Sequence, residues 1–419
     1  MTQSTQSSHR YRALAALGHR DFRRFWFGQV VSLVGGWMHQ TAMAWLVWRL
    51  THDAALLGVM GFVGNVPVLL LGFPAGAMVD RFERRRLVLI AQSFEMVLAL
   101  FTAWLAWSGH VQVWHLVVIA GLFGTSTAIE VPARQTLLMD LVGREHLLSA
   151  IALNSASFST SRVIGPALAG LLLSRITEAG CFLINGLSFL GALLALASMK
   201  PAGGAGGRMA AAYAPWDGLR YVRRRPEMVA LIAQVGAANL FGLPYTQFLP
   251  VFVGGVLGLR EDTLGMFQAS VGCGALLAVL VAASRDPSTL TPRLASRGFL
   301  GFAVALCLFA LYPGYLRGCL LLMVIGFCGS TQMATTNNYL QTQAPEALRG
   351  RVVALYTTTF IGLFPLGCLA LGQVARRAGV QLTVACGAIV CAMIATALLH
   401  RLPAVVPPPE ITAPDDAAD

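Results

Sequence analysis

The chain has few charged residues for its length. They make up 12% of its 419 residues, whereas an average soluble domain has about 25%. A soluble protein of this size would form two or three domains of roughly 150 residues, and no stretch is polar enough to cover their surfaces. The low charge therefore excludes an ordinary soluble protein. The apolar fraction of 56% excludes a disordered chain.

Motifs for metal, redox and nucleotide chemistry are also missing. The eight cysteines fall in apolar stretches, form no CxxC pair and have no histidine at zinc-site spacing, so we interpret them as small core side chains. There is no GxxxxGK[ST] loop for a nucleotide, and no group of histidines, cysteines or carboxylates is typical of catalysis. The first 24 residues lack the apolar core of a signal peptide. We expect no cofactor, no metal and no enzyme activity.

What the sequence does contain is long apolar runs. The 56% apolar fraction corresponds to about 235 residues, enough for about twelve spans of about 20 residues. The runs are continuous, which disfavours a barrel of alternating strands. They predict an all-α membrane protein whose spans cover residues 25–49, 55–78, 87–107, 112–132, 148–174, 180–199, 228–257, 264–283, 297–313, 318–339, 351–374 and 380–400.

A polar break rich in glycine and arginine, at 201–225, divides these spans into six plus six. Residues 120–126 (AGLFGTS) resemble residues 325–331 (IGFCGST), so the halves repeat each other. An even number of spans per half predicts a parallel repeat about an axis along the membrane normal. The predicted parts are a cytoplasmic segment 1–24, a six-helix bundle 25–200, a cytoplasmic linker 201–227, a second six-helix bundle 228–402 and a disordered tail 403–419.

The basic residues between the spans are unevenly placed. The net charge is +11 and Lys200 is the only lysine, a balance that in a soluble protein suggests nucleic acid. With a cytoplasmic N-terminus, 23 of the 30 basic residues lie in cytoplasmic segments and 6 at outer ends. This positive-inside bias predicts a multi-pass protein of a bacterial-type inner membrane with both termini in the cytoplasm. It also explains the charge without nucleic acid.

Two sequence motifs resemble transporter signatures. Residues 76–86 (GAMVDRFERRR) are similar to GxxxDRxGRR of the major facilitator superfamily, with Glu83 in place of a glycine. The predicted span 148–174 is similar to the antiporter signature of drug exporters, although Ala152 and Ser161 replace its first two glycines. The residues of this antiporter-like motif are Ser161, Arg162, Gly165, Pro166 and Gly170. Glycine and proline there would allow close packing and a soft point in the helix, although ordinary small-residue packing explains them too.

Two further segments narrow the resemblance. Residues 132–154 and 340–351, with the Asp80-Arg81 pair, resemble the drug:H⁺ antiporter-3 group over about residues 20–400. The resemblance implies the major facilitator fold, in which twelve transmembrane helices form two six-helix bundles. It also implies substrates that range from siderophores to macrolides.

The same resemblance places the end of the predicted fourth span beside the 76–86 loop. We therefore predict a cytoplasmic gate in which carboxylates pair with arginines, with Glu130 bound to Arg84 or Arg81 and Arg134 bound to Asp80. A stop signal for membrane insertion would need only the arginines. The gate residues are Gly76, Asp80, Arg81, Arg84, Arg85, Glu130 and Arg134.

Ionisable residues inside the membrane are costly and indicate function. Glu95 lies about eight residues into its span, and it is either a protonatable site or a neutral structural acid. His39 is a second candidate for proton coupling, although a lone histidine is more often a packed polar residue. Arg162 lies similarly deep and is predicted to pair with Glu95 or to bind an anionic substrate.

The superfamily resemblance also predicts which polar and aromatic side chains line a central cavity, although each can equally hold helices together. Because acids are rare among them, we expect a bulky, amphipathic, neutral or anionic ligand. The cavity candidates are Trp37, Gln40, Gln234, Asn239, Tyr245, Gln332 and Asn337.

These observations predict a secondary active transporter that exports a small amphipathic molecule, such as a siderophore or a drug-like compound, by alternating access. Its expected partners are the substrate, protons and the lipid bilayer, and we expect a monomer. A lipid or lysophospholipid flippase on the same fold is the alternative. A membrane enzyme or signalling scaffold is disfavoured by the missing catalytic groups.

Overall fold

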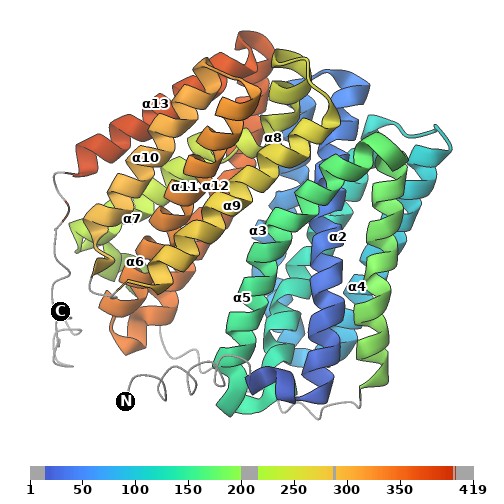
Figure 1. Cartoon of the computed structure of the whole chain (residues 1–419). Helices are drawn as coiled ribbons and strands as arrows, with labels where there is room; N and C mark the ends of the chain where they lie inside the picture. Colours follow the sequence, from blue (N-terminus) through green and yellow to red (C-terminus); the bar gives the residue numbers. More distant parts are fainter. Residues whose placement is uncertain (1–14, 200–215, 286–288, 400–401, 403–419) are drawn as a thin grey trace, which may run out of the picture. The chain divides into compact units, whose positions relative to one another are not determined.

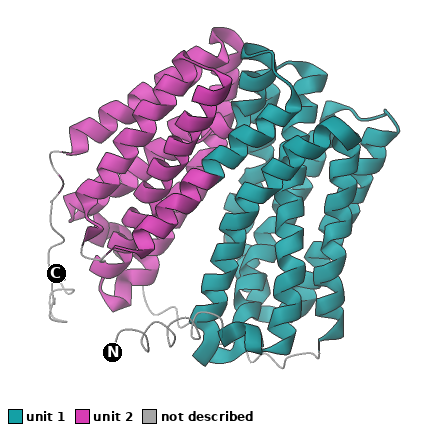
Figure 2. Cartoon of the chain, viewed as in Figure 1, with its two compact units in different colours: residues 1–209, 247–272 teal, residues 210–246, 273–419 magenta. Residues whose placement is uncertain are grey.

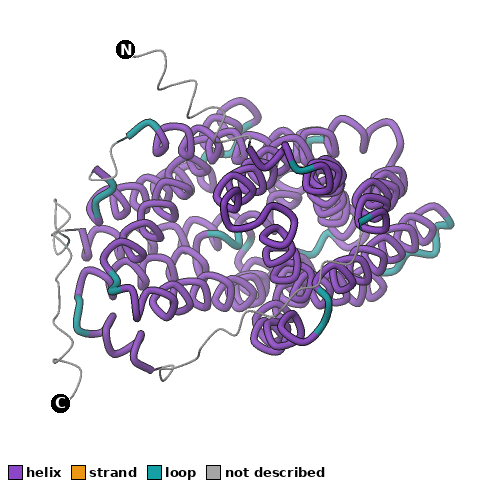
Figure 3. The backbone as a smooth tube through the Cα atoms, turned by 90° about the horizontal axis from the view of Figure 1, so that it is seen from below, coloured by secondary structure: helices purple, strands orange, loops and turns teal. Residues whose placement is uncertain are grey.

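The structure is a computed structural model that describes residues 15–199, 216–285, 289–399 and 402. Every regular element in these ranges is a helix, as Figure 3 shows. The elements labelled in Figure 1 are η1 (Ala15–Gly18), α2 (Arg20–Thr51), α3 (Ala54–Arg81), α4 (Arg84–Trp107), α5 (Val113–Ser198), α6 (Trp216–Arg223), α7 (Pro226–Ala237), η2 (Ala238–Gly242), α8 (Tyr245–Pro250), η3 (Val251–Val256), α9 (Glu261–Ala283), α10 (Pro292–Leu311), α11 (Tyr315–Gln343), α12 (Glu346–Ala378) and α13 (Val380–Leu399).

The backbone of α5 breaks twice, so this 86-residue element is three rods rather than one. Gly143 (φ 70°) and Thr177 (φ 59°) leave the helical region, and a straight helix of that length would measure about 130 Å, far more than the roughly 30 Å of a bilayer core. The breaks fall between the predicted spans 112–132, 148–174 and 180–199. Pro166, where we expected a soft point, stays within the helix.

The predicted span 228–257 is less regular than expected. It consists of α7, η2, α8 and η3, and the two η elements are π-turns. The amide of Leu243 donates to the carbonyl of Ala238, and that of Leu257 donates to Phe252. The segment also contains Pro244 and Pro250, which have no N–H to donate to a regular α-helical ladder, and π-turns are uncommon interruptions of an α-helix.

Apolar side chains face outward along the helices. On α4, Phe94, Val97, Phe101 and Trp104 recur every three or four residues and are exposed, while Gln92 on the same helix is buried. This is the reverse of a soluble amphipathic helix, and it fits a lipid environment. Among the described residues, nine helices are long and apolar enough to cross a membrane.

The chain forms two compact units, coloured separately in Figure 2. Unit 1 comprises residues 1–209 and 247–272, and unit 2 comprises residues 210–246 and 273–419. Residues 247–272, which we assigned to the second bundle, therefore pack with unit 1. Most of the segment 1–24, the linker up to residue 215 and the whole tail 403–419 lie outside the described residues, so those predictions remain predictions.

Each unit has a packed core near one end of its helices. In unit 1, Phe22 and Phe25 of α2 pack with Val88 of α4 and Leu137 of α5. In unit 2, Met228, Leu231, Tyr339, Leu340 and Val352 join α7, α11 and α12. These cores fix the helices that carry the polar residues described next.

Candidate functional site

A cavity of about 380 Å³ lies within unit 1, between α2, α3, α4 and α5. Small residues make room for it, because Gly36, Gly64 and Gly124 all lie in its wall. A Cβ atom on Gly124 would overlap the carbonyl oxygen of Gly64, so α3 and α5 are in backbone contact there. The polar wall consists of Gln29, Ser32, Trp37, His39, Gln40, Asn65, Gln92, Glu95, Thr127, Glu130, Arg134, Asn185 and Gln247.

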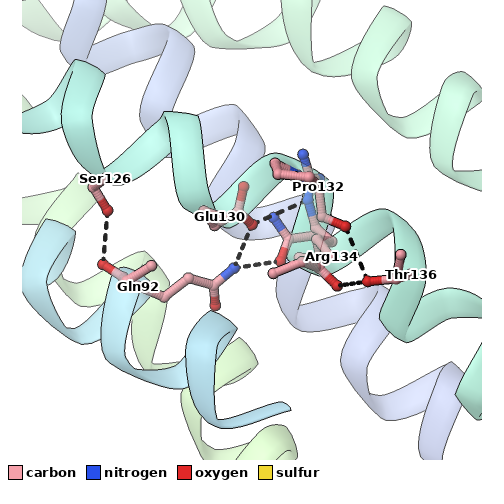
Figure 4. Close-up of polar contacts among 9 residues, drawn as sticks. Gln92, Ser126, Glu130, Pro132, Arg134 and Thr136 are labelled. Carbon is pink, nitrogen blue, oxygen red and sulfur yellow. Dashed lines mark hydrogen bonds and ion pairs between the residues drawn. The ribbon is translucent and has the colours of Figure 1, made fainter. Parts of the chain in front are cut away.

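A buried polar network forms part of this wall. Gln92 Nε2 donates to Gln29 Oε1 at 2.8 Å and to Glu130 Oε1 at 3.2 Å. The Nε of Arg134 lies 3.0 Å from the same Glu130 oxygen. Figure 4 shows Gln92, Glu130 and Arg134 converging from α4 and α5. Burial of a charge requires such partners, and Glu130 obtains both an ion pair and an amide donor.

Glu95 lies beside this network rather than in it. Its carboxyl group interacts with the hydroxyl of Ser126 and lies within electrostatic range of Glu130 and Arg134. The Ser126 hydroxyl also donates to the carbonyl of Ala91 at 3.2 Å. The cavity therefore brings two carboxylates near a single guanidinium.

His39 is the second predicted titratable residue in the cavity wall. Its ring lies between those of Phe123 and Phe182, with centroid distances of 5.0 and 4.7 Å. Both ring nitrogens are buried, and within the described part of the chain neither has a hydrogen-bond partner. The structure does not pair His39 with Glu95, although both face the same cavity.

The predicted gate residues do not form one network. Arg84 Nη1 binds Asp140 Oδ1 at 2.6 Å instead of Glu130, because Glu130 pairs with Arg134, one turn further along α5. Asp80 is exposed at the end of α3, and among the described residues it has no ion pair. The predicted pairing of Asp80 with Arg134 is therefore absent from this structure.

Arg85 and Gly76 also have surroundings that differ from the expectation. Arg85 donates from Nε to the carbonyl of Leu196 at 2.6 Å and from Nη2 to that of Ala197 at 3.1 Å. A Cβ atom on Gly76 would meet nothing within 4 Å, so Gly76 makes no close helix contact here. Arg81 is exposed beside Asp80.

The antiporter-like motif packs α5 against two neighbours. A Cβ on Gly165 would lie 2.5 Å from the Cβ of Trp37 in α2, and one on Gly170 would lie 2.9 Å from the Cα of Gly265 in α9. Ser161 and Pro166 are buried in the same stretch. The expectation of close packing therefore holds at both glycines.

Arg162 lies close to Trp37, which is part of the cavity wall. Its Cζ lies 5.9 Å from the centroid of the Trp37 ring, within the range of a cation–π contact. Its expected partnership with Glu95 stays a prediction.

The remaining cavity candidates belong to unit 2 and are not among the described residues that line the unit 1 cavity. Gln234 is buried and donates to Ser296 Oγ at 2.9 Å, and Asn239 donates to the carbonyl of Val235 at 2.9 Å. The ring of Tyr245 lies 6.4 Å from that of Phe302. Gln332 is buried, and Asn337 accepts a bond from Gln341.

Two ion-pair partners escaped the sequence analysis. Asp140 is the partner of Arg84, and Glu178 forms a two-pronged bridge to Arg49 with distances of 2.9 and 3.1 Å. Polarity inside an apolar run is the signal that could have drawn attention to Asp140. Glu178 has no such signal beyond its place at the end of a span.

Comparison with known proteins identifies the kind of protein that carries this cavity. The sequence profile described as transmembrane secretion effector (MFS_3) matches residues 11–414. The chain belongs to this family. Its relatives include the staphyloferrin A transporter of Staphylococcus aureus, 24% identical over 86% of this chain and 90% of that protein. The multidrug efflux pump Tap of Mycolicibacterium fortuitum is 27% identical over 85% and 90%. The enterobactin exporter EntS of Escherichia coli O1:K1 is 24% identical over 84% and 85%.

Solved structures agree on the fold. A bacterial homologue of the human lysosomal transporter Spinster aligns with a TM-score of 0.71 and 12% identity, over 91% of this chain and 96% of the other. The nucleoside transporter NupG aligns with a TM-score of 0.70 and 11% identity, over 91% and 98%. The chain is thus a multi-pass transporter of the major facilitator superfamily, as its motifs predicted. Its relatives are transporters rather than enzymes.

Proposed function

We propose that this protein exports a small amphipathic molecule across the bacterial inner membrane by alternating access and in exchange for protons. The observation that carries the proposal is the pair of carboxylates beside one guanidinium in a membrane-embedded cavity, formed by Glu95, Glu130 and Arg134. Charges in such a place are retained for substrate or proton binding. The siderophore and drug exporters among its relatives support export over import.

Twelve spans with both termini in the cytoplasm complete the proposed topology. The three rods of α5 count as three spans, and α2 is long enough, at 32 residues, to be one. Together with the eight other apolar helices this gives twelve. An alkaline phosphatase fused to the C-terminus is expected to be inactive and a fluorescent protein there to be fluorescent. An active phosphatase would refute the topology.

Protonation of Glu95 is the proposed coupling event. Unlike Glu130, Glu95 has no ion pair among the described residues, so its charge can change without breaking a bridge. His39 is the second candidate, because it lies in the cavity wall and its buried ring nitrogens have no hydrogen-bond partner among the described residues. Asp80, Arg81, Arg84 and Arg85 are proposed to close the cytoplasmic end in one state of the cycle.

Transport into inside-out vesicles tests this function. Vesicles from cells that produce the full chain are energised with NADH, and the uptake of enterobactin, staphyloferrin A and ethidium is measured. We expect at least one of the three to accumulate, and an uncoupler to abolish the accumulation. Glu95→Gln is expected to remove the proton-driven part, whereas Glu145→Gln, which changes an exposed carboxylate of α5, is the matched control.

The same vesicles distinguish the alternatives. Accumulation that persists with an uncoupler would contradict proton coupling, and uptake into right-side-out vesicles alone would contradict export. A protein that moves none of the three molecules but flips a fluorescent lysophospholipid would be a flippase.

A further inference from the structure

We propose that the exposed basic face of α6 binds the head groups of anionic phospholipids in the membrane leaflet that adjoins this helix. The face consists of Arg220, Arg223 and Arg224 and is called the arginine face below. The inference goes beyond the proposed function, because it concerns the surface of unit 2 and no step of transport. It assigns a partner to a helix that the sequence predicted only as part of a linker.

The three arginines lie on one side of a single helical turn. Residues three and four positions apart share a face of an α-helix, and this spacing joins Arg220 to Arg223 and Arg224. Arg224 continues the last turn of α6, because its amide donates to the carbonyl of Arg220 at 3.3 Å. All three residues are exposed, and none has an ion pair among the described residues. Their guanidinium groups are therefore available to a partner outside the protein.

The other side of α6 is anchored to unit 2. Val222 is buried in the core of this unit, and the hydroxyl of Tyr221 donates to the carbonyl of Gln343 at 3.0 Å. A Cβ atom on Gly218 would lie 2.6 Å from the Cβ of Arg351, so α6 packs closely on α12. These contacts hold the helix in one orientation and keep the arginine face directed outward.

The arginine face lies at the end of a membrane span. The apolar span Pro226–Val256 begins directly after Arg225, and Val229, in its first turn, is 42% exposed. An apolar side chain exposed at the start of a span contacts lipid, so the residues just before it lie at the level of the head groups. Clusters of arginine in such a position attract anionic lipids.

Charge balance around α6 favours an anionic partner. Residues 216–227 contain four arginines but only two acids, Asp217 and Glu227, and Glu227 is half-buried. In the first turn of α12, which packs against α6, the exposed Arg349 is accompanied by one exposed acid, Glu346. The surface that surrounds the arginine face therefore has a net positive charge.

A membrane suits this face better than a dissolved anion. Guanidinium groups bind phosphate oxygens through paired N–H donors, and every phospholipid head group contains a phosphate. Water and salt weaken the attraction between exposed arginines and a single dissolved anion. A bilayer holds its phosphates in a dense layer at the level of the arginine face, so that three guanidinium groups can act together.

Lipid binding to the purified full chain tests the inference. The chain in detergent is titrated with palmitoyloleoylphosphatidylglycerol and, separately, with palmitoyloleoylphosphatidylcholine, and native mass spectrometry measures the affinity for the first bound lipid. Each arginine near an anionic surface contributes about fivefold to binding, so we expect the anionic lipid to bind at least about tenfold more tightly. The preference should decrease at higher ammonium acetate concentration. Equal affinities for the two lipids would overturn the inference.

Two triple variants with the same loss of charge locate the preference. Arg220→Gln/Arg223→Gln/Arg224→Gln is expected to bring the two affinities within about twofold. The control is a triple variant of exposed arginines that an acid follows in the sequence, and it should keep the preference; its substitutions are Arg20→Gln, Arg144→Gln and Arg285→Gln. An equal loss in both variants would show that the preference follows net charge alone, and it would overturn the inference.

The α6 variant should have the same Tm as the wild-type chain without lipid, because its three side chains are exposed. If it does not fold, the single variant Arg223→Gln makes the same test and should lower the preference about fivefold.

Two soluble competitors distinguish a lipid from other anionic partners. Excess inorganic phosphate should not displace phosphatidylglycerol from the chain, and neither should a peptide of residues 403–419, which contains four acids. Displacement by phosphate would assign the arginine face to a dissolved anion. Displacement by the peptide would assign it to the tail of the chain itself. Either result would overturn the inference.

Discussion

Two glycines of unit 1 provide a direct test of how its helices pack. Gly124 of α5 is in backbone contact with Gly64 of α3, and an added Cβ would also lie 3.3 Å from Pro67 Cγ. Gly76, the first residue of the signature loop, has open space where a Cβ would be. The substitutions Gly124→Ala and Gly76→Ala therefore add the same methyl group to helices of the same unit in opposite environments.

The expected energies follow from two opposing effects. Alanine in a helix interior is favoured over glycine by about 0.5–1 kcal/mol, and this gain applies to both variants. Overpacking costs about 1–3 kcal/mol and applies to Gly124 alone, because rigid backbone atoms of Gly64 block the new methyl. We expect Gly76→Ala to be neutral or slightly stabilising, and Gly124→Ala to be less stable than Gly76→Ala by about 1–3 kcal/mol.

Thermal unfolding of the detergent-solubilised chain measures the difference. For a unit of about 200 residues, 1 kcal/mol corresponds to about 2–4 °C in Tm, so the two variants should differ by at least about 2 °C. Equal Tm values would refute the packing of α3 on α5. If Gly76→Ala keeps its Tm but loses transport in vesicles, Gly76 is needed for a close approach in another state of the transport cycle, as the proposed gate requires.

The ion pairs give two further predictions that the same unfolding assay checks. Arg134→Met leaves the buried Glu130 carboxylate unpaired and should lower the free energy of unfolding by about 3–5 kcal/mol. Adding Glu130→Gln should restore part of that stability. A double variant that is no more stable than Arg134→Met would argue against the pair. Asp140→Asn removes the half-buried partner of Arg84 and should lower the free energy of unfolding by about 1–3 kcal/mol. The control is Asp80→Asn, at an exposed site without an ion pair among the described residues, and it should change that free energy by no more than about 0.5 kcal/mol. Equal losses in the two variants would contradict the observed pairing.

The sequence was a good guide to the helices because membrane helices depend on composition. Continuous apolar runs and their arginine boundaries do not rely on distant contacts, so the predicted spans agree with the described helices to within several residues. The break at Gly143 is at a residue that tolerates positive φ. Thr177 gives no such signal, because a β-branched residue is unfavourable at φ 59°. Its neighbour Glu178 is bound by Arg49, a contact that the local sequence does not reveal.

The membership of the cavity wall was predictable only in part, and its pairing was not predictable. The described lining of the unit 1 cavity does not include the candidates Gln234, Asn239, Tyr245, Gln332 and Asn337. Glu95, His39, Trp37 and Gln40 all line the cavity, because polar residues inside apolar runs are informative wherever they occur. The choice of partner for Arg84 is different, since Asp140 lies 56 positions away and competes with Glu130. From the sequence alone, several carboxylates could pair with Arg84. The register of α4 against α5 decides which of them does.

Some polar contacts of unit 1 lie within one helix and others join two helices, and this difference bears on which group can change its protonation state. Glu130 and Arg134 lie on one helix at i and i+4, so motion between helices does not separate them. Contacts between helices, such as Gln92 with Gln29 and Arg84 with Asp140, tie α4 to α2 and α5. We expect a unit whose helices are joined by such contacts to move as a rigid body. Within it, the Glu130–Arg134 pair stays neutralised. A change in pH therefore changes the charge of the cavity only at a group that has no counter-ion.

Glu95 is the carboxylate that meets this condition. Its carboxyl group interacts with the hydroxyl of Ser126 and with the charges of Glu130 and Arg134, and it forms no ion pair among the described residues. Gain or loss of its proton therefore changes the net charge of the cavity without altering the contacts that hold the helices together. In the transport cycle that we propose, this separation would let the charge of the cavity alternate while the packing of unit 1 stays constant.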